Sequence, residues 1–489
     1  MRATLLRCFI SYFILLFFLS CSADLSAQGN KEKLIKALSN LESDPVLKDG
    51  RLGFSLAYVD DKSTIVGLNE SKGLVPASNL KLITTATALA ILGPEYRYET
   101  HLEYDGKIVS GVLDGNLYIR GSGDPTFGSD RFKETDWNLI SDKWLLSLKE
   151  LGIKRITGSV IGDGSVFDNN PIPEGWIWSD IGNYYGAGVF GLNIYENTYK
   201  LIFRPGKVSE KAEILRTEPD LPFNYKNEVI TAAAGTGDNA YIYGSPYTDF
   251  RMVSGTIPAG SREFTIKGSL PDPVGYCAGS FLRKLQENGI EINQKASNIL
   301  FIDKPLVERT KIAVHLSPEL KQVVYYTNMY SINLYAESLL KTLGSYKKKN
   351  GSVKGGLQVV SEYWSDKNIS ECFKIYDGSG LSGTNLVSPN FMVQAMQKIS
   401  LESFSESLYE SLPVAGKSGT LWNVCKGTPA ENKLRAKSGT LKGVICYSGY
   451  VRDKNGKIMA FSIMVNNYSC NYSAMRKKIE EIMAILPTL

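Results

Sequence analysis

The residues best suited to catalysis stand in three short motifs that lie far apart in a chain of 489 residues. Residues 78–81 read Ser-Asn-Leu-Lys, residues 331–333 read Ser-Ile-Asn, and residues 437–440 read Lys-Ser-Gly-Thr. One such pattern recurs by chance in a chain of this length, but the three together, in this order, form the set S-x-x-K, S-x-N and K-[ST]-G. This set supplies a nucleophile, its base, a proton-relay group and an oxyanion donor without a histidine.

Ser78 and Lys81 form the first candidate pair, three residues apart at the start of an apolar helical pattern. Side chains at this spacing share one face of a helix, and a helix N-terminus favours negative charge that develops beside it. A serine hydroxyl is a weak nucleophile until a base accepts its proton. A neutral Lys81 can be that base if burial and neighbouring positive charge lower its pKa. We therefore expect Ser78 to be the nucleophile and Lys81 the general base.

Ser331 and Asn333 lie between two helix-like stretches, 318–327 and 334–343. We expect Ser331 to pass a proton toward a leaving amine, and Asn333 to orient Lys81 and bind a substrate amide. Taken alone, these two residues would more simply be helix caps, as would the serine of the first motif. The interpretation therefore depends on the three motifs occurring together.

Two segments compete as the third motif, because residues 417–420 also read Lys-Ser-Gly-Thr. Segment 437–440 opens an apolar run that leads into a hairpin signal, whereas segment 417–420 leads into loop residues. We therefore choose Lys437, whose ammonium would hold a substrate carboxylate and help to keep the lysine of the first motif neutral. The Thr440 N–H would join that of Ser78 in an oxyanion hole, where one donor is typically worth roughly 3 kcal/mol.

Composition indicates an exported, folded protein of two or three domains. The chain is 43% hydrophobic and 21% charged, and its formal charge of +5 includes no concentrated basic block, so we expect no nucleic-acid partner. Arg2 and Arg7 precede an apolar stretch over 9–19, which is typical of a signal peptide that ends at Ala27. Lipidation at Cys21 is an alternative, and such an anchor would be the only attachment to a membrane.

The sequence offers no template for a metal site, a cofactor or a histidine triad. Its two histidines, His101 and His315, stand apart from metal and triad patterns. The five cysteines that follow the signal segment include no C-x-x-C pair, and Cys446 lies in an apolar run that predicts a buried thiol. We therefore expect no metal and no cofactor.

Periodicity indicates a domain assembled from both halves of the chain. Helical spacing over 31–41 and from 78, strand-like runs over 53–59 and 65–68, and a late hairpin predict an α/β (α+β) fold with a mostly antiparallel sheet flanked by helices. The middle is rich in Gly, Pro, Tyr and short alternating runs, which predict β-rich inserted material. The predicted division is a signal peptide over 1–27, a first half over 28–97, an inserted region of two nested domains over 98–309, and a second half over 310–489.

With these motifs, the chain resembles the low-molecular-mass class C penicillin-binding proteins, which are D-alanyl-D-alanine carboxypeptidase/endopeptidases with a large insert. The separation of Ser78 from Ser331 far exceeds that in class A β-lactamases, and the stretches 121–126, 175–178, 192–197 and 377–382 also match. The chain departs from the family at Ser438, where Thr is common. It departs again in the stretch 415–420, where an acidic residue is usual.

The resemblance implies a β-lactamase/transpeptidase-like domain split by the inserted region. It implies a serine-type D-Ala-D-Ala carboxypeptidase or D,D-endopeptidase that acts on peptidoglycan stem peptides through an acyl-Ser78 intermediate. Peptidoglycan peptides would be its partners, β-lactams its inhibitors, and the periplasm its location. By the same resemblance, Ser438 and Gly439 would contact the substrate, and Asp124 would bind the ammonium of the diamino acid in the stem peptide.

Two alternatives stay open at the level of sequence. One is a β-lactamase or serine esterase of the same fold, although a Glu-x-x-Leu-Asn deacylation motif is missing. The other is a non-catalytic cell-wall scaffold that binds muropeptides without cutting them. An enzyme and a scaffold differ in whether Ser78 forms a covalent adduct.

Overall fold

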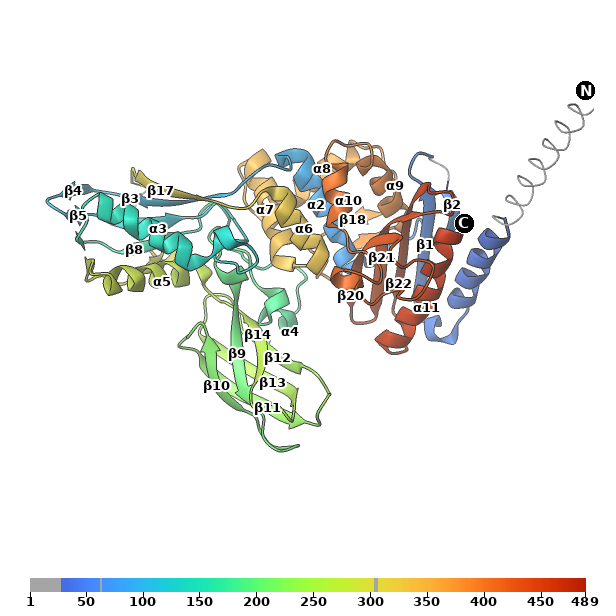
Figure 1. Ribbon diagram of the computed structural model, residues 1–489, viewed down its shortest axis with the longest axis horizontal. Coiled ribbons are helices and arrows are strands. Elements are labelled where there is room, and N and C mark those ends of the chain that lie inside the picture. Colours follow the sequence, from blue (N-terminus) through green and yellow to red (C-terminus); the bar gives the residue numbers. More distant parts are fainter. Residues whose placement is uncertain (1–27, 62–63, 303–306) are drawn as a thin grey trace, which may run out of the picture.

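The computed structural model describes residues 28–61, 64–302 and 307–489. The signal-peptide and lipidation predictions, Cys21 included, fall outside these residues. In Figure 1 the sheet that contains β1 and β22 lies to the right with its helices, a second α/β body lies to the left, and a β-sandwich lies below. We call residues 99–316 the insert and the rest of the described chain the split domain.

The sheet of the split domain is antiparallel throughout, in the order β2-β1-β22-β21-β20. Strand β1 pairs with β22 along its whole length, so the two ends of the chain share one sheet. The inner strands are buried on both faces, because helices cover the sheet on each side. The predicted α/β fold with an antiparallel sheet from both halves is confirmed. The strands are β1 (Arg51–Tyr58), β2 (Thr64–Leu68), β20 (Leu434–Leu441), β21 (Val444–Arg452) and β22 (Ile458–Asn466).

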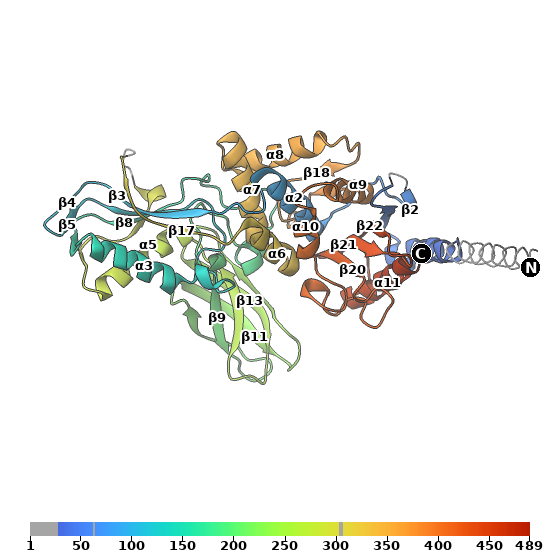
Figure 2. The same ribbon diagram turned by 45° about the horizontal axis from the view of Figure 1, so that its top comes forward.

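Two layers of helices enclose this sheet. A helix over 28–42 and α11 (Tyr472–Ile485) pack on one face through residues such as Leu34, Leu38 and Ile479. Helix α2 (Leu80–Leu92) packs on the other side and is buried over nearly its whole circumference, its lysine and threonines included. Around α2 lie α6 (Leu320–Tyr330), α7 (Asn333–Lys348), α8 (Val353–Ser365), α9 (Pro389–Ile399) and α10 (Ser405–Ser411). Figure 2 shows α2, α6 and α7 between the sheet and the insert.

The end of the chain contains one more strand reversal than the sequence predicts. The apolar run that segment 437–440 opens was expected to lead directly into the late hairpin, but β20 ends at Leu441 and β21 begins at Val444. Gly443 has φ +71°, which a glycine adopts at little cost in so short a turn. The third motif therefore lies on a separate edge strand, β20. Cys446 is buried in β21, as its apolar surroundings predict.

The insert contains a mixed α/β unit and a β-sandwich. Two sheets, β16-β8-β6-β3-β17 and β15-β7-β5-β4, share a core with α3 (Trp137–Glu150) and α5 (Pro273–Glu287). The sandwich packs β10-β9-β14 against β11-β13-β12. The strands are β3 (Glu99–Tyr104), β4 (Lys107–Val109), β5 (Val112–Asp114), β6 (Leu117–Arg120), β7 (Arg155–Ile156), β8 (Val160–Asp163), β9 (Thr198–Arg204), β10 (Glu213–Glu218), β11 (Asn224–Ala232), β12 (Asn239–Tyr243), β13 (Phe250–Pro258), β14 (Phe264–Ser269), β15 (Glu291–Ile292), β16 (Ser297–Asn298) and β17 (Thr310–Leu316).

Two features of the insert were not predicted. Helices α3 and α5 interrupt what the sequence suggested was β-rich material. Strand β17 pairs with β3, so we propose that the insert ends at Leu316 and not at residue 309. Over the described ranges, none of the helices combines the length and the apolar character that a membrane crossing requires.

Candidate active site

Ser78 lies just before the N-terminus of α2, a helix that is buried along most of its length. It belongs to a 3-10 turn, η2 (Ala77–Asn79), which runs directly into α2. The turn is anchored from beneath, because the buried Asn79 Nδ2 donates a hydrogen bond to Ser448 Oγ on β21 at 2.8 Å. The Ser78 side chain is half-buried and lines an open hollow. The serine is therefore both held in place and accessible.

Lys81 is fully buried one turn further along and makes three polar contacts. Its Nζ lies 2.9 Å from Ser78 Oγ, 2.6 Å from Asn333 Oδ1 and 2.7 Å from the carbonyl oxygen of Ser379. Burial lowers the pKa of Lys81 to about 7, against the opposing effect of the buried carboxylates Asp377 and Glu337. Near neutral pH the amine therefore loses its proton readily.

The geometry around Lys81 decides where its lone pair points. The Ser379 carbonyl oxygen can only accept, and so can Asn333 Oδ1, whose amide orientation is fixed by a 2.7 Å bond from Asn333 Nδ2 to the Tyr185 carbonyl. A neutral amine has two hydrogens, and these two acceptors use both. The remaining lone pair faces the Ser78 hydroxyl, which is the arrangement a general base requires.

Ser331 and Lys437 form a second pair beside the first. Ser331 ends α6 with φ 60° and ψ 39°, which turns the chain sharply before Asn333 opens α7. The buried Lys437 Nζ donates to Ser331 Oγ at 2.9 Å and to the Ser438 carbonyl at 2.7 Å. Burial, and then the nearby charge of Lys81, hold the pKa of Lys437 well below its ordinary value. The two ammonium groups repel each other, so the site favours one charge between the two lysines.

Strand β20 runs beside the nucleophile, and Gly439 permits this close approach. A Cβ at residue 439 would lie 2.7 Å from the Pro76 carbonyl oxygen and 2.9 Å from the Ser78 nitrogen. Only a glycine fits there without displacing one of the two segments. The next residue, Thr440, is exposed and lines the same hollow as Ser78.

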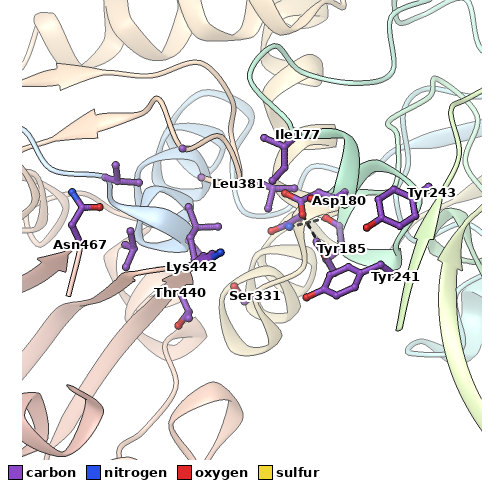
Figure 3. A pocket seen from close by; sticks show the side chains of 18 residues that line it. Ile177, Asp180, Tyr185, Tyr241, Tyr243, Ser331, Leu381, Thr440, Lys442 and Asn467 are labelled. Carbon is purple, nitrogen blue, oxygen red and sulfur yellow. Dashed lines mark hydrogen bonds between the residues drawn. The ribbon is translucent and has the colours of Figure 1, made fainter. Parts of the chain in front are cut away.

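Two hollows meet at Ser78, and both include Ser331 and Thr440 in their walls. The larger, of about 830 Å³, extends between the insert and the split domain (Figure 3). Its insert wall carries Ile177, Asp180, Tyr185, Tyr241 and Tyr243, and its opposite wall carries Lys442 and Asn467. The smaller, of about 450 Å³, is lined by Tyr330, Thr420, Trp422, Ser438, Tyr447 and Tyr472 among others. A substrate can therefore extend in both directions from the serine.

The family model for the D-Ala-D-Ala carboxypeptidase 3 (S13) family matches residues 34–488. This chain belongs to that family. The S13 assignment confirms the resemblance to penicillin-binding carboxypeptidases, and with it the prediction of a D-Ala-D-Ala carboxypeptidase at the level of the family.

Similar proteins agree with the S13 assignment. The D-alanyl-D-alanine carboxypeptidase DacB of Haemophilus influenzae is 28% identical over 425 residues, covering 86% of each chain. The D-alanyl-D-alanine carboxypeptidase of Actinomadura sp. is 26% identical over 438 residues, covering 87% of this chain and 79% of that one. The crystal structure of penicillin binding protein 4 (dacB) of Haemophilus influenzae has a TM-score of 0.76 at 26% identity, covering 93% of this chain and 97% of that one.

The predicted site residues of this S13 protein divide into those that meet and one that stands apart. Lys81 contacts Ser78 and Asn333, and Lys437 contacts Ser331. Ser438, Gly439 and Thr440 follow Lys437 on β20. The competing Lys417 is exposed in the loop before a 3-10 turn, η7 (Gly419–Leu421).

Asp124 does not reach the hollows beside Ser78. It is 2% exposed, and its Oδ1 accepts bonds from the Thr126 N–H at 2.8 Å and from Thr126 Oγ1 at 2.6 Å. Burial raises its pKa to about 6. The carboxylate that does line the larger hollow is Asp180, two residues after the 175–178 stretch that the resemblance had picked out.

A second group of residues beside Lys81 could not be read from the motifs. Glu337 accepts from the N–H groups of Gly378 and Ser379 at 2.7–3.0 Å, and Asp377 accepts from the N–H groups of Gly380 and Ser382 at 2.9 and 2.7 Å. Both carboxylates are buried, and together they shape the turn that presents the Ser379 carbonyl to Lys81. The 377–382 stretch was visible as a family match, but its function was not.

Proposed function

We propose that this protein cleaves the terminal D-Ala-D-Ala bond of peptidoglycan stem peptides, with Ser78 as nucleophile and Lys81 as general base. The observation that carries this proposal is the Lys81 Nζ, 2.9 Å from Ser78 Oγ and with both its hydrogens taken by other acceptors. The S13 family and the printed names of the relatives supply the substrate class.

In the acylation step, Lys81 takes the Ser78 proton while Oγ attacks the carbonyl carbon between the two D-alanines. The backbone N–H groups of Ser78 and Thr440 stabilise the oxyanion. Ser331 gives its hydrogen to the leaving nitrogen and regains one from Lys437, which already donates to it. The C–N bond breaks, free D-alanine leaves, and the peptide remains as an ester on Ser78.

In the deacylation step, water attacks the ester carbonyl and its proton returns to Lys437 through Ser331. The C–O bond to Ser78 breaks, and Lys81 gives the first proton back to Ser78 Oγ. The enzyme is thereby restored, with Lys437 charged and Lys81 neutral. The carboxylate of an incoming substrate favours this distribution, because it stabilises the positive charge on Lys437.

The same chemistry extends to D,D-endopeptidase action, in which the leaving amine belongs to a cross-linked peptide. The smaller hollow has a volume of about 450 Å³, enough for a leaving group much larger than one alanine. In the larger hollow, Asp180 is placed to pair with the ammonium of the diamino acid, a role for which the buried Asp124 is poorly placed.

We further propose export to the periplasm by a signal peptide over residues 1–27, with lipidation at Cys21 as the alternative form. β-Lactams would act as substrate mimics that trap Ser78 as a slow ester, in keeping with the penicillin binding protein 4 that this chain resembles.

The test is intact mass spectrometry after incubation with a penicillin, with the wild type beside Ser78→Ala, followed by assay of D-alanine release from a D-Ala-D-Ala peptide. A stable penicilloyl adduct only in the wild type, together with D-alanine release, is the expected result. Rapid loss of the drug without an adduct would instead indicate a β-lactamase. Peptidoglycan binding with neither adduct nor hydrolysis would indicate a scaffold.

A further inference from the structure

The second Lys-Ser-Gly-Thr segment, at 417–420, does not replace the third motif, yet its last residue reaches the same site. The Ser438 hydroxyl donates a hydrogen bond to Thr420 Oγ1 at 2.7 Å. Thr420 and Ser438 both line the smaller hollow, together with Ser78 and Ser331. The two segments therefore meet through their hydroxyl groups beside the nucleophile.

The loop that carries Thr420 is held in a fixed conformation. Gly419 has φ +54°, and a Cβ there would lie 2.5 Å from the backbone oxygen of Met329, two residues before Ser331. Ser418 Oγ accepts a bond from the Val414 N–H at 3.0 Å, which closes the loop from the other side. These contacts fix Thr420 against the turn that carries Ser331.

Thr420 matters because the ammonium of Lys437 does not reach the surface of the hollow. Lys437 is fully buried, is absent from the described walls of both hollows, and donates to Ser331 Oγ and the Ser438 carbonyl. An anion in the smaller hollow meets hydroxyl groups that stand in front of this charge. Ser438 has already given its hydrogen to Thr420, so the hydrogen of Thr420 itself is free to point into the hollow.

We propose that Thr420 is a substrate-binding residue whose hydroxyl donates to the terminal carboxylate of the leaving D-alanine. Lys437 donates to the Ser438 carbonyl and the Ser438 hydroxyl donates to Thr420, so Ser438 contacts both the buried ammonium and the hydroxyl that faces the hollow. This inference rests on the proposed function, because it assumes a substrate that ends in a free carboxylate.

The experiment compares wild type, Thr420→Val and Thr420→Ser on one acylated tripeptide ending in D-Ala-D-Ala, offered as the free acid and as its C-terminal amide. Loss of a hydrogen bond to a charged group lowers kcat/KM on the free acid about 10- to 100-fold in Thr420→Val. The amide has no terminal charge, so kcat/KM on the amide changes about twofold or less in the same variant. The preference of the enzyme for the acid is therefore lost. Thr420→Ser keeps the hydroxyl and restores the preference.

Lys417→Ala is the matched control from the same loop, since this lysine is exposed and lines neither hollow. We expect Lys417→Ala to have the wild-type kcat/KM on both the free acid and the amide. Equal losses on acid and amide in Thr420→Val would overturn the proposal, because they would show a structural role, and an unchanged acid preference would overturn it too. A wild type that releases no D-alanine from the acid would overturn the proposed function itself, and this inference with it.

Discussion

The protonation of Lys81 is set mainly by its burial, which is opposed by two buried carboxylates that contact the turn behind it. Burial lowers the pKa of Lys81 to about 7, and the charges of Asp377 and Glu337 raise it. The neutral amine is the active form, so acylation by a penicillin rises with pH through a midpoint near 7. Stopped-flow or quenched-flow acylation rates at a series of pH values measure that midpoint. A rate that is flat from about pH 5 to 9 would exclude a lysine base with this pKa.

Glu337→Gln tests the electrostatic part of this arrangement. Burial and the neighbouring Asp377 raise the pKa of Glu337 to about 7. The hydrogen bonds that Glu337 accepts from backbone N–H groups act in the opposite direction, because they stabilise its charged form. Other charged groups that face it are Lys81 from α2 and Lys341 from its own helix. Removal of its negative charge lowers the pKa of Lys81, so the acylation midpoint moves to lower pH by on the order of one unit. A lower plateau with an unmoved midpoint would indicate a purely structural role.

Asp180→Asn separates the two carboxylates proposed for ammonium binding. Asp180 faces the larger hollow, and Asp124 is buried in its own turn. We expect Asp180→Asn to reduce kcat/KM about tenfold on a stem peptide with a free side-chain ammonium, since a charge-assisted hydrogen bond is lost. The same peptide with that amine acetylated is unaffected. If Asp124→Asn, and not Asp180→Asn, removes the difference between the two peptides, the expectation from the sequence was right.

At the scale of residues, sequence motifs identify residues that act through their side chains but not residues that act through backbone atoms. Ser78, Lys81, Ser331, Asn333 and Lys437 could be named because their motifs have fixed spacing. Ser379 contributes a carbonyl oxygen, which any residue has, so no pattern of side chains points to it. Thr420 belongs to segment 417–420, which was rejected as the third motif in favour of the identical segment 437–440, so its side chain was not considered as part of the site.

At the scale of elements, the turn over 377–382 and the turn before α2 are packed without a gap. Gly380 has φ +80°, and a Cβ there would lie 1.9 Å from the carbonyl oxygen of Ala77. Gly380→Ala must therefore move one of the two turns, and either movement separates Lys81 from Ser78 or from Ser379. We expect acylation to slow by at least about 100-fold, in line with a misplacement of roughly 1 Å.

Gly383→Ala, directly after the same turn, is the control, because Gly383 lines the larger hollow but a Cβ there meets nothing within 4 Å. It should form the penicilloyl adduct at about the wild-type rate. Circular dichroism of both variants checks that the fold survives. Similar acylation rates for the two alanine variants would contradict the account of the packed turns.

The elements also show where sequence reasoning fails. Strands β1, β2 and β22 and helix α2 follow simple periodicity and were predicted. The reversal between β20 and β21 was missed, because Lys442-Gly443 forms a two-residue turn inside one continuous apolar run. Helix α3 was missed although Trp137, Ile140 and Trp144 have helical spacing, because the surrounding Gly- and Pro-rich segments dominated the interpretation.

At the scale of the whole molecule, the insert is fastened to the split domain at the residues nearest the chemistry. Asn333 donates to the Tyr185 carbonyl, and the buried Lys341 Nζ pairs with Asp168 at 2.7 Å. Trp176 Nε1 donates to Asp377 Oδ2 at 2.9 Å. The insert therefore supplies both a wall of the larger hollow and part of the support for the turn behind Lys81.

Trp176→Phe removes the last of these contacts while keeping an aromatic ring in the buried site. Asp377 then loses one of the donors to its Oδ2, although the Ser382 N–H remains at 2.7 Å. Because a buried carboxylate loses a hydrogen-bond donor, we expect the free energy of unfolding, measured by denaturant titration, to fall by about 1–3 kcal/mol. Acylation should also slow, because the same carboxylate holds the turn that presents Ser379 to Lys81. Trp178→Phe, two residues along and 54% exposed, should change neither quantity, so equal effects in the two variants would show that the insert does not act through Asp377.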